Sequence, residues 1–152
     1  MRIGLISDTH GLLRPEAAAA LRGVELIVHA GDVGGLTIVE SLRRIAPVHA
    51  VAGNVDPEGS FPPAIDLDLE GVRVHVSHGH EVGSPTPERL AARIEADVIV
   101  YGHTHRALIR RVGRALVINP GAAGPARFRL IPSLALLDVP ACKATIVRLS
   151  RE

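Results

Sequence analysis

The sequence predicts one α/β domain with two sheets, extending over residues 1–152. Its length matches that of a single ordinary domain, and its 47% of hydrophobic residues is enough for a sizeable core. In the first third, short apolar runs alternate with helical patterns, which is typical of parallel βαβ units. In the second half, apolar runs come in pairs around short turns, which is typical of antiparallel hairpins. We therefore expect parallel strands first and antiparallel strand pairs later.

The first third contains two expected βαβ units. Apolar runs at 3–6, 26–30 and 48–52 predict buried strands. An Ala-rich segment at 14–21 predicts the first helix. Residues 36–45 predict the second helix because their apolar side chains recur at close to helical spacing.

The rest of the chain is expected to be rich in strands. Residues 55–63 carry several Pro and Gly residues and predict a loop. Residues 87–96 predict a helix with Thr86 as its N-cap, and residues 98–101 predict another buried strand. Three hairpins complete the pattern: 65–69 with 72–77 around Glu70-Gly71, 108–112 with 115–118 around Gly113-Arg114, and 134–139 with 144–149 around Pro140-Ala141.

Composition excludes several classes of protein. The 17 basic and 16 acidic residues leave a net charge of +1, so no specific binding to nucleic acid or membranes is implied. Only Phe61, Tyr101 and Phe128 are aromatic, which weighs against stacking of bases. Cys142 is the only cysteine, which excludes an intrachain disulfide and a thiolate-rich metal cluster. Since no apolar run is long enough for a signal or a membrane span, we expect a cytoplasmic protein.

Polar side chains follow the apolar strands at the points where the strands end. Because ligands of open α/β sheets gather outside the carboxyl ends of strands, we expect these side chains to converge. In Asp8-Thr9-His10, extended backbone would place the first and third side chains on the same side, and His103-Thr104-His105 repeats this spacing. Carboxylate and imidazole donors without sulfur suit divalent ions such as Mn²⁺, Fe²⁺, Ni²⁺, Co²⁺ or Zn²⁺. The expected ligands are Asp8, His10, Asp32, Asn54, His78, His103 and His105.

Each of these motifs has another interpretation when it is taken singly. An Asp-Thr-His segment after a strand is typical of a helix N-cap, and Asp32 and Asn54 alone are typical turn residues. Turn chemistry has no reason to place histidines at successive strand ends, so the combination favours a metal site. By contrast, His29, His49 and His75 lie inside predicted strands among apolar neighbours, and we expect them to be packing histidines.

Five motifs carry these residues: Asp8-Thr9-His10-Gly11, His29-Ala30-Gly31-Asp32, Ala52-Gly53-Asn54-Val55-Asp56, Ser77-His78-Gly79-His80 and Tyr101-Gly102-His103-Thr104-His105. In identity, order and spacing they resemble those of the calcineurin-like metallophosphoesterases, and more narrowly the small prokaryotic phosphodiesterase-like members. Asn119-Pro120-Gly121-Ala122 stands where the small members carry Asn-Pro-Gly-Ser. The resemblance covers residues 1–148. It implies a four-layer α-β-β-α sandwich of two mixed sheets flanked by helices.

The resemblance implies a centre for two divalent metal ions, for which we expect Mn²⁺ ahead of Ni²⁺, Fe²⁺, Co²⁺ or Zn²⁺. One ion would be held by Asp8, His10 and His105. The other would be held by Asn54, His78 and His103, and the carboxylate of Asp32 would bridge the two. A hydroxide between the ions would attack the phosphorus of a phosphoester. The residues implied as catalytic, through this hydroxide and through phosphate positioning, are Asp32, Asn54, His78 and His103, with His80 as a further candidate.

Counting charges favours a small phosphodiester as the substrate. Two divalent ions, two aspartates and one hydroxide leave about one positive charge, which a monoanionic diester neutralises. A dianionic monoester would need a further cation such as Arg127. Arg127 and Asn119 lie in a late loop and are either phosphate contacts or surface and turn residues.

One position departs from the wider superfamily. Many members carry a His between the Asn and Asp of the third motif, where it assists the leaving group, and here Val55 takes that place, as in the small members. Asp56 would otherwise orient that His, so its role is open. A scaffold, as in one eukaryotic retromer subunit with a depleted metal site, and a regulatory binding protein with little turnover are the alternative functions. A homo-oligomer is compatible with the sequence.

Overall fold

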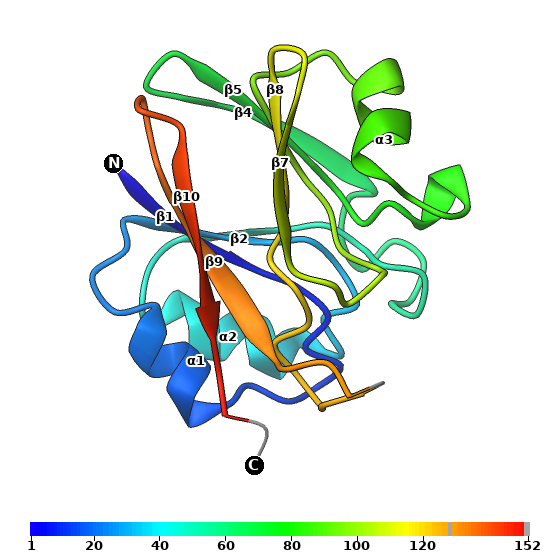
Figure 1. The fold of residues 1–152 in the computed structure, drawn as a ribbon. Coiled ribbons are helices and arrows are strands. Elements are labelled where there is room, and N and C mark those ends of the chain that lie inside the picture. Colours follow the sequence, from blue (N-terminus) through cyan, green and yellow to red (C-terminus); the bar gives the residue numbers. More distant parts are fainter. Residues whose placement is uncertain (128, 151–152) are drawn as a thin grey trace.

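The computed structural model describes residues 1–127 and 129–150. Two five-stranded mixed sheets stack face to face, with two helices outside the first sheet and one outside the second (Figure 1). This is the α-β-β-α sandwich that the motifs predict. The helices are α1 (Pro15–Ala20), α2 (Leu36–Arg43) and α3 (Pro87–Arg93), and a short 3-10 helix, η1, covers His80–Val82.

The first sheet contains β1 (Arg2–Ile6), β2 (Leu26–His29), β3 (Val48–Ala50), β9 (Ser133–Asp138) and β10 (Lys143–Arg148), in the order β10-β9-β1-β2-β3. As the βαβ pattern predicts, β1, β2 and β3 are parallel. The last hairpin extends this sheet, because β9 runs antiparallel to β1 and β10 runs antiparallel to β9. The first sheet is therefore mixed, and the parallel strands of the first third are only part of it.

The second sheet contains β4 (Ala64–Leu69), β5 (Val72–Ser77), β6 (Val98–Val100), β7 (Leu108–Val112) and β8 (Ala115–Asn119), in the order β4-β5-β6-β8-β7. The expected hairpins β4–β5 and β7–β8 are confirmed as antiparallel pairs. Strand β6 joins them through parallel pairing with both β5 and β8. The carboxyl ends of β5 and β6 therefore lie at the same edge of this sheet.

The core has three layers because the central strands bury both of their faces. In β6, Val98 and Val100 point between the two sheets, whereas Ile99 packs under α3. In β1, Leu5 lies between the sheets and Ile6 faces the layer of α1 and α2. Strands that are buried on both faces are continuously apolar rather than alternating, which is why short apolar runs mark them in the sequence.

The element ends depart little from those expected. Thr86 is confirmed as the N-cap of α3, since its hydroxyl accepts a hydrogen bond of 3.1 Å from the backbone N–H of Arg89. The same helix ends at Arg93, earlier than expected, because Ile94 has extended backbone and packs into the layer below α3. Among the described residues, no helix has the length and apolar character needed to cross a membrane.

Candidate metal centre

The expected ligands occupy unusual backbone conformations. Among the described residues, eight non-glycine residues have positive φ, and five of these eight are expected ligands: Asp8, His10, Asp32, His103 and His105. A positive φ is costly for a residue with a side chain and is concentrated at functional sites. The extended backbone that we assumed for Asp8-Thr9-His10 is therefore wrong, since Asp8 has φ 54° and His10 has φ 46°. Both pairs of side chains reach the site from tight left-handed turns.

The carboxylate of Asp8 is fully buried and its two oxygens have different surroundings. Oδ2 accepts hydrogen bonds from the hydroxyl of Ser7, at 2.7 Å, and from the backbone N–H of His103, at 3.2 Å. Within the described part of the chain, Oδ1 has no hydrogen-bond partner. The side chain is thus anchored through one oxygen and presents the other to the site.

Three imidazoles face this free oxygen. Asp8 Oδ1 lies 3.4 Å from His105 Nε2, 3.7 Å from His78 Nε2 and 3.9 Å from His10 Nε2. These separations suit donor atoms around a common cation, because ligands about 2.0–2.2 Å from an ion stand about 3–4 Å from one another. Buried polar atoms normally have partners, and within the described residues Asp8 Oδ1, His10 Nε2 and His78 Nε2 have no hydrogen-bond partner, so their donor set suits a bound cation.

Asp32 faces the same imidazoles from the next strand end. Its Oδ1 accepts a hydrogen bond of 3.0 Å from the backbone N–H of Val55, while Oδ2 lies 3.2 Å from His78 Nε2 and 3.7 Å from His10 Nε2. Burial alone would raise the pKa of Asp32, but the contact with His78 and the bond from Val55 lower it to about 2. The carboxylate is therefore charged at every ordinary pH.

His78 is oriented by the backbone behind it. Its Nδ1 lies 2.8 Å from the carbonyl oxygen of Ala30, so this nitrogen carries the proton and donates it. Nε2 is thereby left to face the carboxylates, which is the arrangement that metal-binding histidines commonly show. Burial tends to lower the pKa of His78, but Asp32 and Asp8 raise it above its usual value.

Two other expected ligands have lowered pKa values. Burial is the main cause for His10, where Arg127 acts in the same direction against the carboxylates of Asp32 and Asp8. Burial also lowers the pKa of His103, with His78 adding to the effect. Both imidazoles are accordingly held in the neutral form, which is the form that binds a metal ion.

Two groups of donor atoms are close enough together to hold an ion. The first is Asp8, His10 and His105, and the second is Asp8, Asp32 and His78; within each group the donor atoms lie within 4.8 Å of one another. Both contain only oxygen and nitrogen donors, as borderline and hard divalent ions require. The residues present therefore fit divalent metal ions.

A model of the calcineurin-like phosphoesterase superfamily domain matches residues 1–141. This chain belongs to that superfamily.

Individual relatives agree with the assignment. Escherichia coli phosphodiesterase YfcE is 32% identical over an alignment 164 residues long, which covers 91% of this chain and 88% of that protein. The structure of an archaeal phosphodiesterase superposes with a TM-score of 0.83 and 26% identity, covering 98% of this chain and 100% of the other. Zinc-bound Vps29 of Entamoeba histolytica has the same fold, with a TM-score of 0.82, 21% identity and full coverage of both chains.

The remaining ligand expected in this calcineurin-like chain, Asn54, follows Gly53, whose backbone packs against Asp32. Its side chain is exposed, whereas the N–H of the next residue, Val55, is bonded to Asp32. The rings of His78 and His103 meet edge to face with centroids 5.3 Å apart. His80, placed on η1, lies 5.3 Å from His78 and 6.3 Å from His103. The structure thus brings the further candidate His80 into the same imidazole cluster.

Of the two interpretations left open for Asn119, a phosphate contact or a turn residue, its contacts agree with the turn residue. It is fully buried, and its Nδ2 donates to the carbonyl oxygen of Gly102 at 3.2 Å and to Thr104 Oγ1 at 3.0 Å. Its Oδ1 accepts the N–H of Gly121 at 2.9 Å. With both ends of the amide engaged, Asn119 braces the turn that presents His103 and His105.

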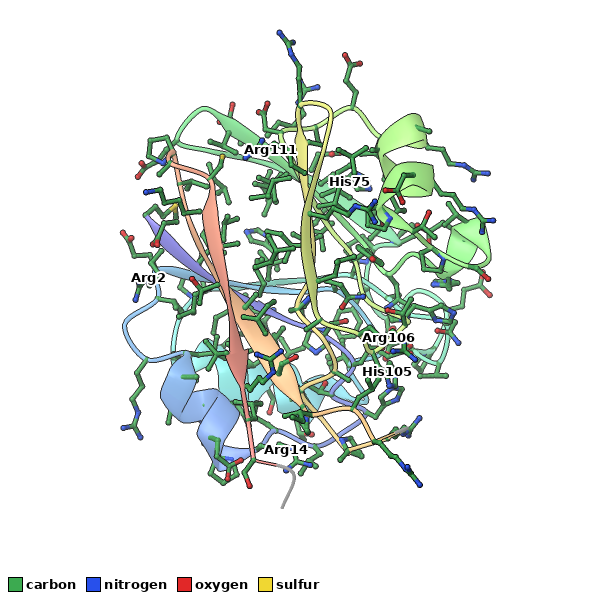
Figure 2. All side chains as sticks on the ribbon, in the orientation of Figure 1. Arg2, Arg14, His75, His105, Arg106 and Arg111 are labelled. Carbon is green, nitrogen blue, oxygen red and sulfur yellow. The ribbon has the colours of Figure 1, made fainter. Side chains whose placement is uncertain are left out.

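The histidines inside strands have three different environments. His29 is buried as expected, and His75 is half-buried with Nδ1 2.9 Å from Asp66 Oδ1. The expectation that His49 packs in the core is wrong, because it is exposed on β3 at the edge of the first sheet. His75 lies well away from His105, which is at the end of the molecule that carries the expected metal ligands (Figure 2).

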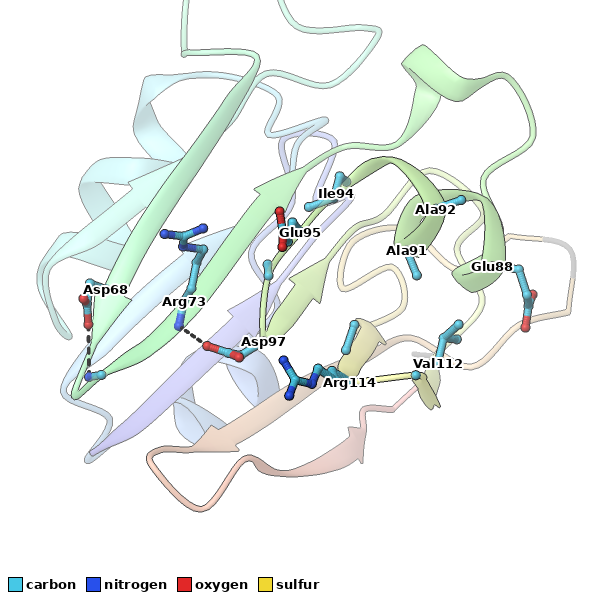
Figure 3. Close-up of a pocket in the computed structure, with 14 residues that line it drawn as sticks. Asp68, Arg73, Glu88, Ala91, Ala92, Ile94, Glu95, Asp97, Val112 and Arg114 are labelled. Atoms are coloured by element: carbon cyan, nitrogen blue, oxygen red, sulfur yellow. Dashed lines mark hydrogen bonds between the residues drawn. The ribbon is translucent and has the colours of Figure 1, made fainter.

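A prominent pocket of the described residues lies away from the metal centre. It is an open groove of about 750 Å³ beside α3 (Figure 3). Its lining includes Gly71, Asp97 and Gly113, which lie near the amino ends of the second sheet's strands β5, β6 and β8. The expected ligands follow the carboxyl ends of β5 and β6, so this groove and the metal centre lie at opposite ends of the sheet.

His29 links two of the turns that carry expected ligands, a role that its place in a predicted strand does not indicate. The hydroxyl of Thr9 donates to the carbonyl oxygen of Val33 at 2.6 Å, so it must accept from Nε2 of His29, 3.0 Å away. Nδ1 of His29 accepts the N–H of Gly31 at 3.1 Å. A neutral imidazole with its proton on Nε2 therefore links the turn of Asp8 and His10 to the turn of Asp32.

The neutral state of His29 predicts that the free energy of unfolding depends on pH. Burial is the main cause that lowers the pKa of His29 from 6.5 to about 4. Between these values the unfolded chain binds a proton that the folded chain does not, so the unfolding free energy falls as the pH falls through this window. The contribution amounts to about 2 kcal/mol between pH 7.5 and pH 5.

We expect His29→Gln to remove that contribution. In urea unfolding of the metal-free protein, the variant should lose about 2 kcal/mol less than the wild type when the pH changes from 7.5 to 5. His49→Gln, which changes an exposed histidine, should keep the wild-type dependence. Equal pH dependence in wild type and His29→Gln would contradict the neutral assignment.

Proposed function

We propose that this chain is a phosphodiesterase with a centre for two divalent metal ions. The observation that carries the proposal is Asp8 Oδ1, a buried oxygen 3.4–3.9 Å from nitrogens of three imidazoles. Membership of the calcineurin-like superfamily supplies the reaction class. Two such ions, when bound, turn water into a nucleophile at neutral pH and offset charge on the phosphoryl oxygens.

The residues of the chain divide between two ion positions in this proposal. Asp8, His10 and His105 would hold the first ion, and Asn54, His78 and His103 the second. Asp32 Oδ2 lies within 3.7 Å of His10 Nε2 and 3.2 Å of His78 Nε2, which supports its assignment to both. Mn²⁺ is the first candidate because oxygen and imidazole donors without sulfur suit it.

A monoanionic diester fits the charge of this centre. Two divalent ions and two aspartates would leave about two positive charges, which one phosphodiester and one hydroxide together offset. The guanidinium of Arg127 adds positive charge near His10, as its lowering of the pKa of His10 indicates. Arg127 is exposed in the loop that lies beside His105, from which it would steady a phosphoryl oxygen.

Exposed apolar side chains around the centre support an apolar ester group. Leu12, Leu36 and Val55 have exposed fractions of 40%, 64% and 59%. Each lies within four residues of an expected ligand along the chain. The N–H of Gly11 donates to the carbonyl oxygen of Val33 at 3.0 Å, and the N–H of Val55 donates to Asp32, so the three turns adjoin. Apolar contact there would favour diesters with an aryl group.

The number of bound ions tests the dinuclear centre. Metal-depleted protein titrated with Mn²⁺ should bind two equivalents per chain, measured by elemental analysis after removal of free metal. His10→Ala should lower the occupancy, whereas His75→Ala, which removes a histidine paired with Asp66 outside the centre, should leave it at two. A saturating value of zero or one in the wild type would refute the dinuclear arrangement.

Turnover separates an enzyme from a scaffold or a regulatory binding protein. Protein loaded with each of Mn²⁺, Ni²⁺, Fe²⁺, Co²⁺ and Zn²⁺ would be assayed with a chromogenic aryl phosphodiester and with the corresponding monoester. We expect faster turnover of the diester. Metal-loaded protein that binds two ions and turns over neither ester would favour the alternatives.

A further inference from the structure

The carboxylate of Asp56 lies between two turns that carry expected ligands. Its Oδ1 accepts the N–H of Val33 at 3.0 Å and the N–H of Gly34 at 3.2 Å. Its Oδ2 accepts the N–H of Gly53 at 2.8 Å and makes a second contact of 3.2 Å with the N–H of Val33. Hydrogen bonds to a charged acceptor are stronger than those between neutral groups. Asp56 therefore holds three backbone donors from two separate turns.

The backbones of these two turns pack closely against each other. The first carries Asp32 just before Val33, and the second carries Asn54 just after Gly53. A Cβ atom on Gly53 would overlap the Oδ1 and backbone N of Asp32, so only glycine allows the approach. Any movement of Gly53 relative to Val33 would accordingly change the distance between the Asp32 carboxylate and the Asn54 side chain.

We propose that Asp56 is a positioning residue that sets the separation of Asp32 and Asn54 and thereby the affinity of the second ion position. The inference rests on the proposed function, in which those two residues share that ion. Asp56 acts through the backbone of both turns and does not itself touch the ion. The residue before Asp56 is Val55, so there is no imidazole at that position for Asp56 to orient. The carboxylate of Asp56 joins the two turns instead.

The two acceptor oxygens of the Asp56 carboxylate allow the proposal to be tested by substitution. Asp56→Asn keeps the size of the side chain but leaves one acceptor oxygen in place of two. In the place of Oδ1, that oxygen can serve Val33 and Gly34, which releases Gly53; in the place of Oδ2, it can serve Gly53 and keeps only the longer contact with Val33, which releases Gly34. In either placement the amide NH₂ faces a backbone N–H, so the junction between the two turns is weakened.

Asp68→Asn is the matched control. Asp68 is an exposed aspartate in the β4–β5 hairpin, and a single oxygen accepts the N–H of Gly71 at 3.0 Å (Figure 3). An Asn side chain can make that bond in full, and the hairpin lies at the end of the sheet opposite the metal centre. The substitution removes the same charge without setting an amide NH₂ against a backbone N–H.

The experiment is calorimetric titration of the metal-depleted full chain with Mn²⁺. Wild type and Asp68→Asn should each bind two ions. Asp56→Asn should keep the first affinity and weaken the second by about 10–100-fold, the usual effect of removing a group that orients ligands. Asp56→Glu, which keeps both acceptor oxygens, should recover part of the second affinity. In the metal-free protein, the amide NMR resonances of Gly53 or Val33 should move in Asp56→Asn and not in Asp68→Asn.

Three results would overturn the inference. These are an unchanged second affinity in Asp56→Asn, an equal loss at both ion positions with a lowered unfolding midpoint, and unmoved Gly53 and Val33 amides. If Asp56→Asn does not fold, Asp56→Glu decides, and wild-type affinity at both positions would count against the proposal. A wild type that binds fewer than two ions would refute the proposed function, while the metal-free amide shifts would still decide whether Asp56 joins the turns.

Discussion

Replacing Asp32 with Asn is expected to lower kcat/KM for an aryl phosphodiester by about 10³-fold or more. Asp32 Oδ2 lies 3.2 Å from His78 Nε2 and 3.7 Å from His10 Nε2, where it would be shared between two ions. Asn keeps the shape and removes a negative charge between two cations. Metal-ion stabilisation of a transition state is worth several kcal/mol, and about 1.4 kcal/mol corresponds to tenfold in rate. Steady-state kinetics with measured metal content at saturating Mn²⁺ would record the loss.

His80→Ala is the comparison for this variant. The His80 ring lies 5.3 Å from that of His78, but its side chain is 37% exposed at the rim. We expect a loss of about tenfold at most, with unchanged metal content, because a neighbour of a ligand contributes less than a shared carboxylate. Comparable losses in the two variants, at equal metal content, would show that the roles are wrongly assigned.

Aryl phosphodiesters are expected to be cleaved far faster than simple dialkyl ones. Val55 occupies the position from which a histidine would protonate the departing oxygen. A positioned general acid contributes about 10²–10⁴-fold, and alkoxides need it more than phenolates, which leave as stabilised anions. In a series of substituted phenyl diesters, kcat/KM should therefore rise steeply as the pKa of the leaving group falls. A shallow slope, with chemistry shown to limit the rate, would mean that another acid is in place and would direct attention to His80.

Val55→His tests the same idea by adding the missing group. Val55 is 59% exposed, so an imidazole can be accommodated there. The Asp56 carboxylate is already bonded to Gly53 and Val33, so it is not available to orient the new ring. We expect kcat/KM for dialkyl diesters to rise about tenfold, which is less than the rate gain from a well-positioned general acid. Val55→Gln, a polar change without an acid, should show no gain, and equal gains in both variants would refute this explanation.

The elements of this fold could be predicted from the sequence because their signals are local. Thr86 marks the start of α3 through a bond to a residue three positions away. Glu70 and Gly71, with φ 53° and 83°, make the turn between β4 and β5 that their residue types predict. Short apolar runs mark β1 and β6 because both faces of those strands are buried.

The donor types of the metal centre were also predictable, and for a topological reason. Parallel strands bring their carboxyl ends to one edge, so Asp8 and Asp32 converge although 24 positions separate them. His78 and His103 converge in the same way after the parallel strands β5 and β6. The order of motifs along the chain was therefore enough to name these donors before their distances were known.

Only the tertiary structure decided how those donors are held. Asn119 and Asp56 are residue types that suit a turn, a ligand or a substrate contact equally well. Asp56 bonds Val33, 23 positions away, and Asn119 bonds Gly102, 17 positions away, so their partners lie on other turns. The pairing of β9 with β1 likewise joins Arg2 to Asp138. Such contacts depend on how the two sheets stack and on which turns are adjacent. Hydrophobic periodicity reflects only the neighbours within one helix or strand, so it does not predict these contacts.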